Sequence, residues 1–225
     1  WSQGLIFFGL LGIYFLNLRQ LAYPFGDHYW KNLVAFLNLS ATCLTLSTFT
    51  GRFVFPLVSL EGRRFWVLGL VPMSRRTLLW GKFWFAFLGG ITVAGVLITV
   101  SDSMLQVPLP MAMIHAYSLV VICAGLAGLA VGLGAAFPNF KEDSPSKIVS
   151  GFGGTLNLVL SLGFMVAVVL LEAIPCHLYY AVGKMGWLDF RRVILGCSLG
   201  VLLLGALTVM IPMRMGLRAF RRMDL

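Results

Sequence analysis

Long stretches without a charged residue alternate with short charged stretches along this chain. A helix needs about 20 consecutive apolar residues to cross the hydrocarbon core of a bilayer. Most of the charge-free stretches reach or nearly reach that length, and the first is slightly shorter. They cover residues 1–18, 32–51, 83–101, 103–140, 148–171 and 193–213. The pattern therefore predicts about six membrane-spanning helices.

These stretches define an all-α polytopic membrane protein made of a single transmembrane domain over residues 1–225. Backbone amides in lipid must be satisfied within their own segment, which favours helices, and the period-two alternation of a membrane barrel is absent. Because the chain opens on Trp1, we expect it to be a piece of a longer protein. The expected spans cover residues 4–18, 33–58, 81–101, 111–137, 150–172 and 193–213.

The composition supports a membrane protein and excludes several other classes. Of 225 residues, 59% are hydrophobic and 11% are charged, too few charges to cover a soluble domain of this size. The four cysteines have no CxxC spacing, so neither a disulfide framework nor a metal site is indicated. The net charge of +9 suits anionic lipid headgroups, and no basic stretch has the pattern of a nucleic-acid site.

The basic residues also predict an orientation. Residues 52–82, residues 138–147 and the tail from Arg214 together hold most of the 17 lysines and arginines. Cytoplasmic loops retain Lys and Arg, so these three stretches are expected in the cytoplasm, together with both ends of the chain.

The segment 59–80 is expected to form a cytoplasmic elbow between the second and third spans. It is interpreted as a short helix, a break and a second helix that continues into the third span. Glu61 is placed near the start of the first helix, where its charge would complement the helix dipole. Pro72 cannot continue that helix, and Ser74 is positioned as the N-cap of the next one. A positive-inside loop with an interfacial aromatic anchor is the simpler interpretation.

Polar side chains inside the spans are candidates for a pathway. They either bond between helices, which is the commoner case, or line a cavity. Small residues at four-residue spacing, such as Gly128 and Gly132, indicate close packing of helices. The pathway candidates are Asn38, Thr42 and Thr45 of the second span and Asn157 and Ser161 of the fifth.

The segment 173–192 mixes apolar, aromatic and polar residues. Pro175 is expected to end the fifth span, and the following residues are expected to re-enter the outer leaflet as an interfacial or re-entrant segment. A surface position is expected for Glu172, at the outer end of the span. The candidates for an outer gate are Glu172, His177, Tyr179 and Tyr180.

Two blocks of sequence resemble a known family. The first has the order S-L-E-G-R-R-x-W, then P-x-S-R-R, then a lysine, over residues 59–82. The second runs from Phe137 to Gly154 and contains P-x-F followed by S-P-x-x-I. Both are similar to permease subunits of bacterial ATP-binding-cassette (ABC) exporters of the type-2 class, and more narrowly to the C-terminal half of the large ABC exporter permeases.

The resemblance implies a membrane-spanning permease of an ATP-driven exporter in the bacterial plasma (inner) membrane. The elbow would be the coupling helix that docks on a separate ATPase subunit, and a second copy or a homologous upstream half would complete the pathway. The phosphate loop G-x-x-x-x-G-K-[ST] is absent, so ATP and Mg²⁺ would bind the ATPase, and this chain would be neither an enzyme nor a cofactor carrier. The implied coupling residues are Glu61, Gly62, Arg63, Arg64, Trp66, Pro72, Ser74, Arg75 and Arg76.

Two other functions stay open at this point. A polytopic membrane enzyme acting on lipid-linked substrates would need acidic residues or histidines gathered at one membrane face. The three histidines are far apart in the sequence, and Glu142-Asp143 is the one adjacent acidic pair. A channel would need a filter motif or a charged ring, and neither is evident.

Overall fold

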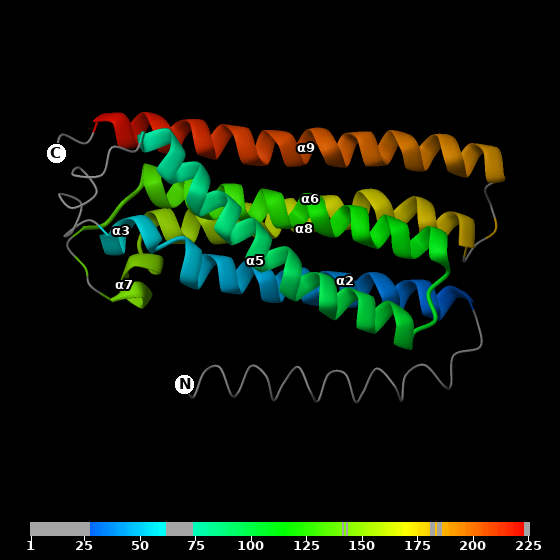
Figure 1. Ribbon diagram of the computed structural model, residues 1–225. Coiled ribbons are helices and arrows are strands. Elements are labelled where there is room, and N and C mark those ends of the chain that lie inside the picture. The colour runs from blue at the N-terminus through cyan, green and yellow to red at the C-terminus, as the bar shows by residue number, and fades with distance from the viewer. Residues whose placement is uncertain are drawn as a thin grey trace.

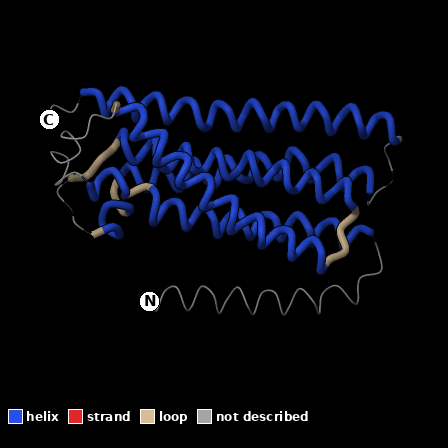
Figure 2. The backbone as a smooth tube through the Cα atoms, viewed as in Figure 1, coloured by secondary structure: helices blue, strands red, loops and turns tan. Residues whose placement is uncertain are grey.

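The chain folds into a bundle of long helices, shown by a computed structural model that describes residues 28–61, 74–140, 142, 144–180, 183 and 186–222. In these residues the helices are α2 (His28–Phe49), η1 (Thr50–Val54), α3 (Leu57–Glu61), α5 (Arg75–Met104), α6 (Leu109–Ala136), α7 (Pro145–Val149), α8 (Phe152–Tyr180) and α9 (Trp187–Arg222). Figure 2 shows helices joined by short loops at the two ends of the bundle, with no strand in the described part.

Five of these helices are long and apolar enough to cross a membrane, which confirms an all-α polytopic membrane protein. The candidate spans are Leu33–Glu61, Arg75–Met104, Leu109–Ala136, Phe152–Tyr180 and Trp187–Ala219. The expected first span, residues 4–18, lies outside the described residues. The other spans exceed the predicted lengths because the helices continue past the apolar stretches into polar sequence.

The helix α6 forms the centre of the bundle. In its most apolar window 83% of the residues are buried inside the protein, against 28% for α5 and 11% for α9. Figure 1 shows α9 along one side, α6 and α8 in the middle, and α5 crossing the bundle obliquely. The exposed faces of α5 and α9 are apolar, as the surface of a membrane domain must be where it meets lipid.

The second span does not keep a regular α-helix throughout. After Phe49 it widens into a π-helical turn, in which the Phe55 N–H donates to the Thr50 carbonyl over 3.0 Å. Pro56 has no N–H to donate, which removes one α-helical bond next to this turn. The chain then continues as α3, so the span reaches Glu61.

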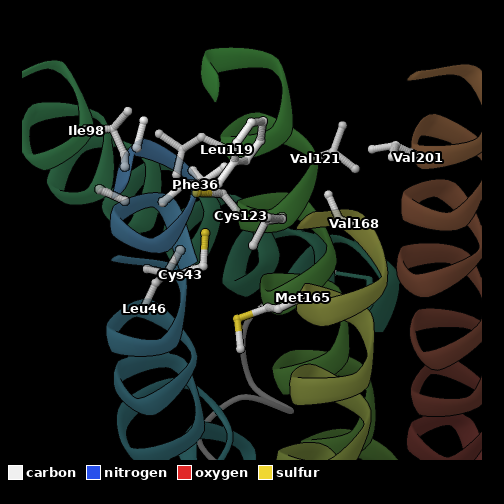
Figure 3. Close-up of a cluster of buried hydrophobic side chains, with 14 of the residues drawn as sticks. Phe36, Cys43, Leu46, Ile98, Leu119, Val121, Cys123, Met165, Val168 and Val201 are labelled. Atoms are coloured by element: carbon white, nitrogen blue, oxygen red, sulfur yellow. The ribbon is translucent and has the colours of Figure 1, made fainter. Parts of the chain in front are cut away.

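The core divides into two clusters along the bundle. Figure 3 shows part of the first, where Cys43 of α2 and Met165 of α8 point toward the cluster centre and Val121 of α6 faces Val201 of α9. The second cluster joins α3, the start of α5, α6 and α7 through buried residues such as Val58, Leu79 and Ile148, and so lies at the end of the bundle that carries the elbow.

Small residues let α6 and α9 approach closely. A Cβ atom on Gly128 would lie 2.8 Å from the Cα of Val209, and one on Gly132 would meet the backbone of Pro212 and Met213. The small residues predicted to mark close packing therefore serve contacts within this chain at Gly128 and Gly132. By contrast, a Cβ on Gly196 or Gly200 of α9 would meet nothing.

Candidate functional site

The base of the elbow is closed by an ion pair. Lys82 Nζ of α5 lies 2.6 Å from Glu61 Oε1 at the end of α3, and the Lys82 side chain is 11% exposed. The expected place of Glu61 near the start of a helix is wrong, because the second span continues helically through the π turn and makes Glu61 the last residue of α3. Glu61 therefore does not lie at a helix N-terminus, where the helix dipole would stabilise its charge, and it pairs with Lys82 instead.

The second limb of the elbow begins as the sequence predicts. Ser74 caps α5: its side chain accepts a hydrogen bond from the Thr77 N–H over 3.1 Å. Arg76 in the first turn is exposed, and Arg75 is half-buried and makes a contact of its own. The other expected coupling residues, Gly62, Arg63, Arg64, Trp66 and Pro72, lie outside the described residues.

The two blocks of sequence that carried the resemblance meet at this end of the bundle. The Asn139 N–H donates to the Ser59 hydroxyl over 3.0 Å, which ties the loop after α6 to α3. Gly153 packs so tightly that an added Cβ would lie 2.7 Å from Phe137 Cβ and 3.1 Å from the Phe55 ring. Residues far apart in the sequence thus build one compact support beneath the elbow.

The pathway candidates do not gather in one place. Asn38, Thr42, Asn157 and Ser161 are buried, and Thr45 is half-buried. The Asn38 amide of α2 donates to the Ser101 hydroxyl of α5, whereas Asn157 lies beside Gly51. Asn38 and Asn157 therefore contribute to contacts between helices, and the role of the five candidates in a pathway stays a prediction.

The expected break at Pro175 is wrong, because α8 runs through this proline to Tyr180. A proline is tolerated inside a membrane helix where neighbouring helices support the backbone around it. In the described residues, 173–180 and 187–192 are the end of α8 and the start of α9 rather than a separate segment.

Aromatic rings hold the ends of α8 and α9 together. The ring of Tyr179 stacks on Phe190 with centroids 4.3 Å apart, and the Tyr180 ring meets Phe190 edge-on at 5.7 Å. Phe190, which sequence reasoning did not select, is 4% exposed and is the ring that both tyrosines contact. His177 lies in the last turn of α8 and has a contact of its own. Whether these residues form a gate stays a prediction.

Glu172 is fully buried, so the expected surface position is wrong. Glu172 comes near the end of an apolar stretch of sequence, where a surface position was expected. In the structure α8 continues for eight residues beyond it, and Glu172 is among the buried residues of this helix. Its Oε2 bonds to the hydroxyl of Ser118 on α6, and its Oε1 has no hydrogen-bond partner among the described residues.

A second buried pair lies one turn away along α6. Both carboxylate oxygens of Asp102 on α5 lie 3.1 Å from His115 Nδ1, and the His115 ring is fully buried against the edge of Phe36. Sequence reasoning missed this pair. The signal was present, because the tight turn at 105–108, with Gln106 at φ 51°, makes α5 and α6 a hairpin. The hairpin brings the end of α5 beside the first turns of α6, where Asp102 meets His115.

A groove between α5 and α6 reaches this buried pair. It has a volume of about 260 Å³ and is lined by mostly apolar residues, with Thr99, Asp102 and Ser103 as its polar members. No group of three or more metal-ligating side chains occurs in the part of the chain that the structure describes. Asp102 therefore lines the groove and bonds to His115, which lies one turn along α6 from the Ser118–Glu172 pair.

Comparison with known proteins identifies a family. The family model described as "Putative ATP-binding cassette" matches residues 1–225. No curated protein and no solved structure matches the chain. Because the family match covers the whole sequence, the chain belongs to this ABC-related family.

Proposed function

We propose, with membership of this ABC-related family as the premise, that the chain is the membrane-spanning permease of an ATP-driven exporter. The observation that carries the proposal is the built support beneath the elbow. The ion pair between Glu61 and Lys82, the cap at Ser74 and the bond from Asn139 to Ser59 fix both limbs that flank residues 62–73. Because its flanking helices are held in place, a displacement of this segment by a partner would be transmitted to the spans.

The helix α5 is the element that would transmit this push. Its 30 residues, Arg75–Met104, run without a break from the elbow to just beyond the buried pair at Asp102. Helices and packed cores shift as units rather than deforming continuously. A displacement of the elbow by a partner would therefore reach the opposite end of the bundle, where α5 is bonded to α2 and α6.

The partner in this proposal is an ATPase subunit that binds ATP and Mg²⁺, since the chain itself carries no phosphate-loop motif. A second copy of the chain, or a homologous half, would supply the other side of the pathway. The proposed location is the bacterial plasma membrane, with the elbow in the cytoplasm.

Photo-crosslinking in intact cells tests the coupling role. A photoreactive amino acid at Arg76, which is exposed on the elbow, should crosslink to a polypeptide that contains a phosphate loop, identified by mass spectrometry. The matched control is Trp187, 55% exposed at the other end of the bundle, which should give no such product. An ATPase captured from Trp187 and not from Arg76 would overturn the proposal.

A further inference from the structure

We propose that Asp102, His115, Ser118 and Glu172 form a proton-binding site inside the bundle, open to solvent through the groove between α5 and α6. The site lies at the end of the bundle opposite the elbow (Figure 1), and it does not depend on the proposed exporter function. Its proton resides on Glu172 in the state that the structure describes.

The hydrogen bonds of Ser118 favour a proton on Glu172. The Ser118 hydroxyl lies 2.8 Å from the Ile114 carbonyl and also bonds to Glu172 Oε2. A serine has one hydrogen to donate. If Glu172 were ionised, Ser118 would have to satisfy two acceptors with that one hydrogen. If Glu172 is protonated, its O–H donates to Ser118, and Ser118 donates to Ile114, so that both bonds are made.

The surroundings of Glu172 also favour the neutral form. Among the residues that the structure describes, none forms an ion pair with the fully buried side chain of Glu172, and none bonds to its Oε1. A buried carboxylate without a cation is strongly disfavoured. The titratable neighbours are Tyr117 of α6 and Cys176 of α8, which interact electrostatically with it, and Cys197 of α9, next to Cys176. His177 lies between one and two turns further along α8.

The Asp102–His115 pair connects this carboxyl to the groove. His115 and Ser118 lie one turn apart on the same face of α6, so the two pairs are adjacent. His115 uses Nδ1 for Asp102, and its buried Nε2 has no partner in the described part of the chain. Asp102 is 8% exposed and lines the groove.

Proton uptake at this site changes few bonds. A proton that enters by way of the groove forms the O–H bond of Glu172, and release breaks that bond and returns the proton to the groove. The charge of the buried carboxyl changes by one, while Ser118 switches its single hydrogen between Ile114 and Glu172. From α2, Phe36 contacts the His115 ring and Asn38 bonds to Ser101, next to Asp102; neither side chain titrates.

Infrared spectroscopy of the purified chain in lipid tests the proposal. At neutral pH the wild-type protein should show the C=O band of a protonated, buried carboxyl group that shifts in D₂O. Glu172→Gln keeps the shape of the side chain and its bond to Ser118, and it should remove the band. The control Glu142→Gln, at an exposed carboxylate paired with Lys147 over 3.3 Å, should leave it unchanged.

A second variant tests the route to solvent. Asp102→Asn should keep the band but slow its exchange with D₂O by on the order of a hundredfold, as loss of a positioned proton-transfer group does. Size-exclusion chromatography establishes that each variant is folded. A wild-type protein without the band, a band that survives in Glu172→Gln, or unchanged exchange in Asp102→Asn would overturn the assignment.

Discussion

At the scale of single residues, Lys82 and Glu61 show how sequence position and structural role can differ. The lysine lies inside α5, two residues past the end of the elbow, and its flexible side chain reaches the end of α3 while its stem remains buried. With the Lys82 side chain 11% exposed, this ion pair is shielded from water more than a surface pair is. The pair therefore stabilises the position of α5 relative to α3.

A double-mutant cycle measures this dependence. With Glu61→Gln, Lys82→Gln and the double variant, thermal unfolding in detergent should give a coupling free energy of about 1 kcal/mol, the upper value for pairs that are not fully buried. The matched control is the pair Lys147–Glu142, whose side chains are 68% and 38% exposed, and its coupling should be near zero. Equal coupling free energies in the two cycles would mean that the burial of Lys82 does not strengthen its ion pair with Glu61.

At the scale of the helices, local chemistry was predicted from the sequence and tertiary contacts were not. The N-cap at Ser74 was predicted because a serine hydroxyl and the first turn of a helix are neighbours in the chain. Pro175 was wrongly expected to end α8. The expectation considered only the missing N–H of proline, whereas contacts with neighbouring helices allow the helix to continue. The Asp102–His115 pair was missed because each residue lies in a different span, and their meeting depends on the hairpin.

The contact between α6 and α9 gives the clearest prediction at this scale. Gly132→Ala would push a methyl group into the backbone of Pro212, which cannot yield as a side chain can. The helices must separate, and we expect the free energy of unfolding to fall by about 1–3 kcal/mol, the cost of overpacking a close contact.

Gly89→Ala in α5 is the matched control, since an added Cβ there meets nothing. Its stability should be unchanged or higher by about 0.5–1 kcal/mol, because alanine loses less backbone entropy than glycine in a helix. Thermal unfolding of both variants in the same detergent decides the matter. If Gly132→Ala were as stable as Gly89→Ala, the close approach of α6 and α9 would be wrong.

At the scale of the whole molecule, the bundle has two chemically different ends. One end carries the elbow base with its basic residues, and the other carries the buried proton site and the aromatic contacts of Tyr179 and Phe190. The distribution of Lys and Arg predicts that the elbow end faces the cytoplasm.

Cysteine labelling tests this orientation. Single cysteines at Thr77 and Ser103, both exposed and at opposite ends of α5, should react with a membrane-impermeant maleimide from opposite sides of the membrane. In intact cells only the Ser103 position should be labelled, and Thr77 should react after the membrane is opened. The four native cysteines are replaced by serine or alanine beforehand. Labelling of Thr77 from outside would reverse the orientation.

The central position of α6 also has a consequence for how the protein is made. The helices emerge in the order of the sequence, so α6 enters the membrane before α8 and α9, which later enclose it. Until α9 arrives, the surface around Gly128 and Gly132 has no partner in the chain, and until α8 arrives, Ser118 has no Glu172. A chain still on the ribosome therefore exposes to lipid, or to the insertion machinery, a helix that the finished protein keeps away from both.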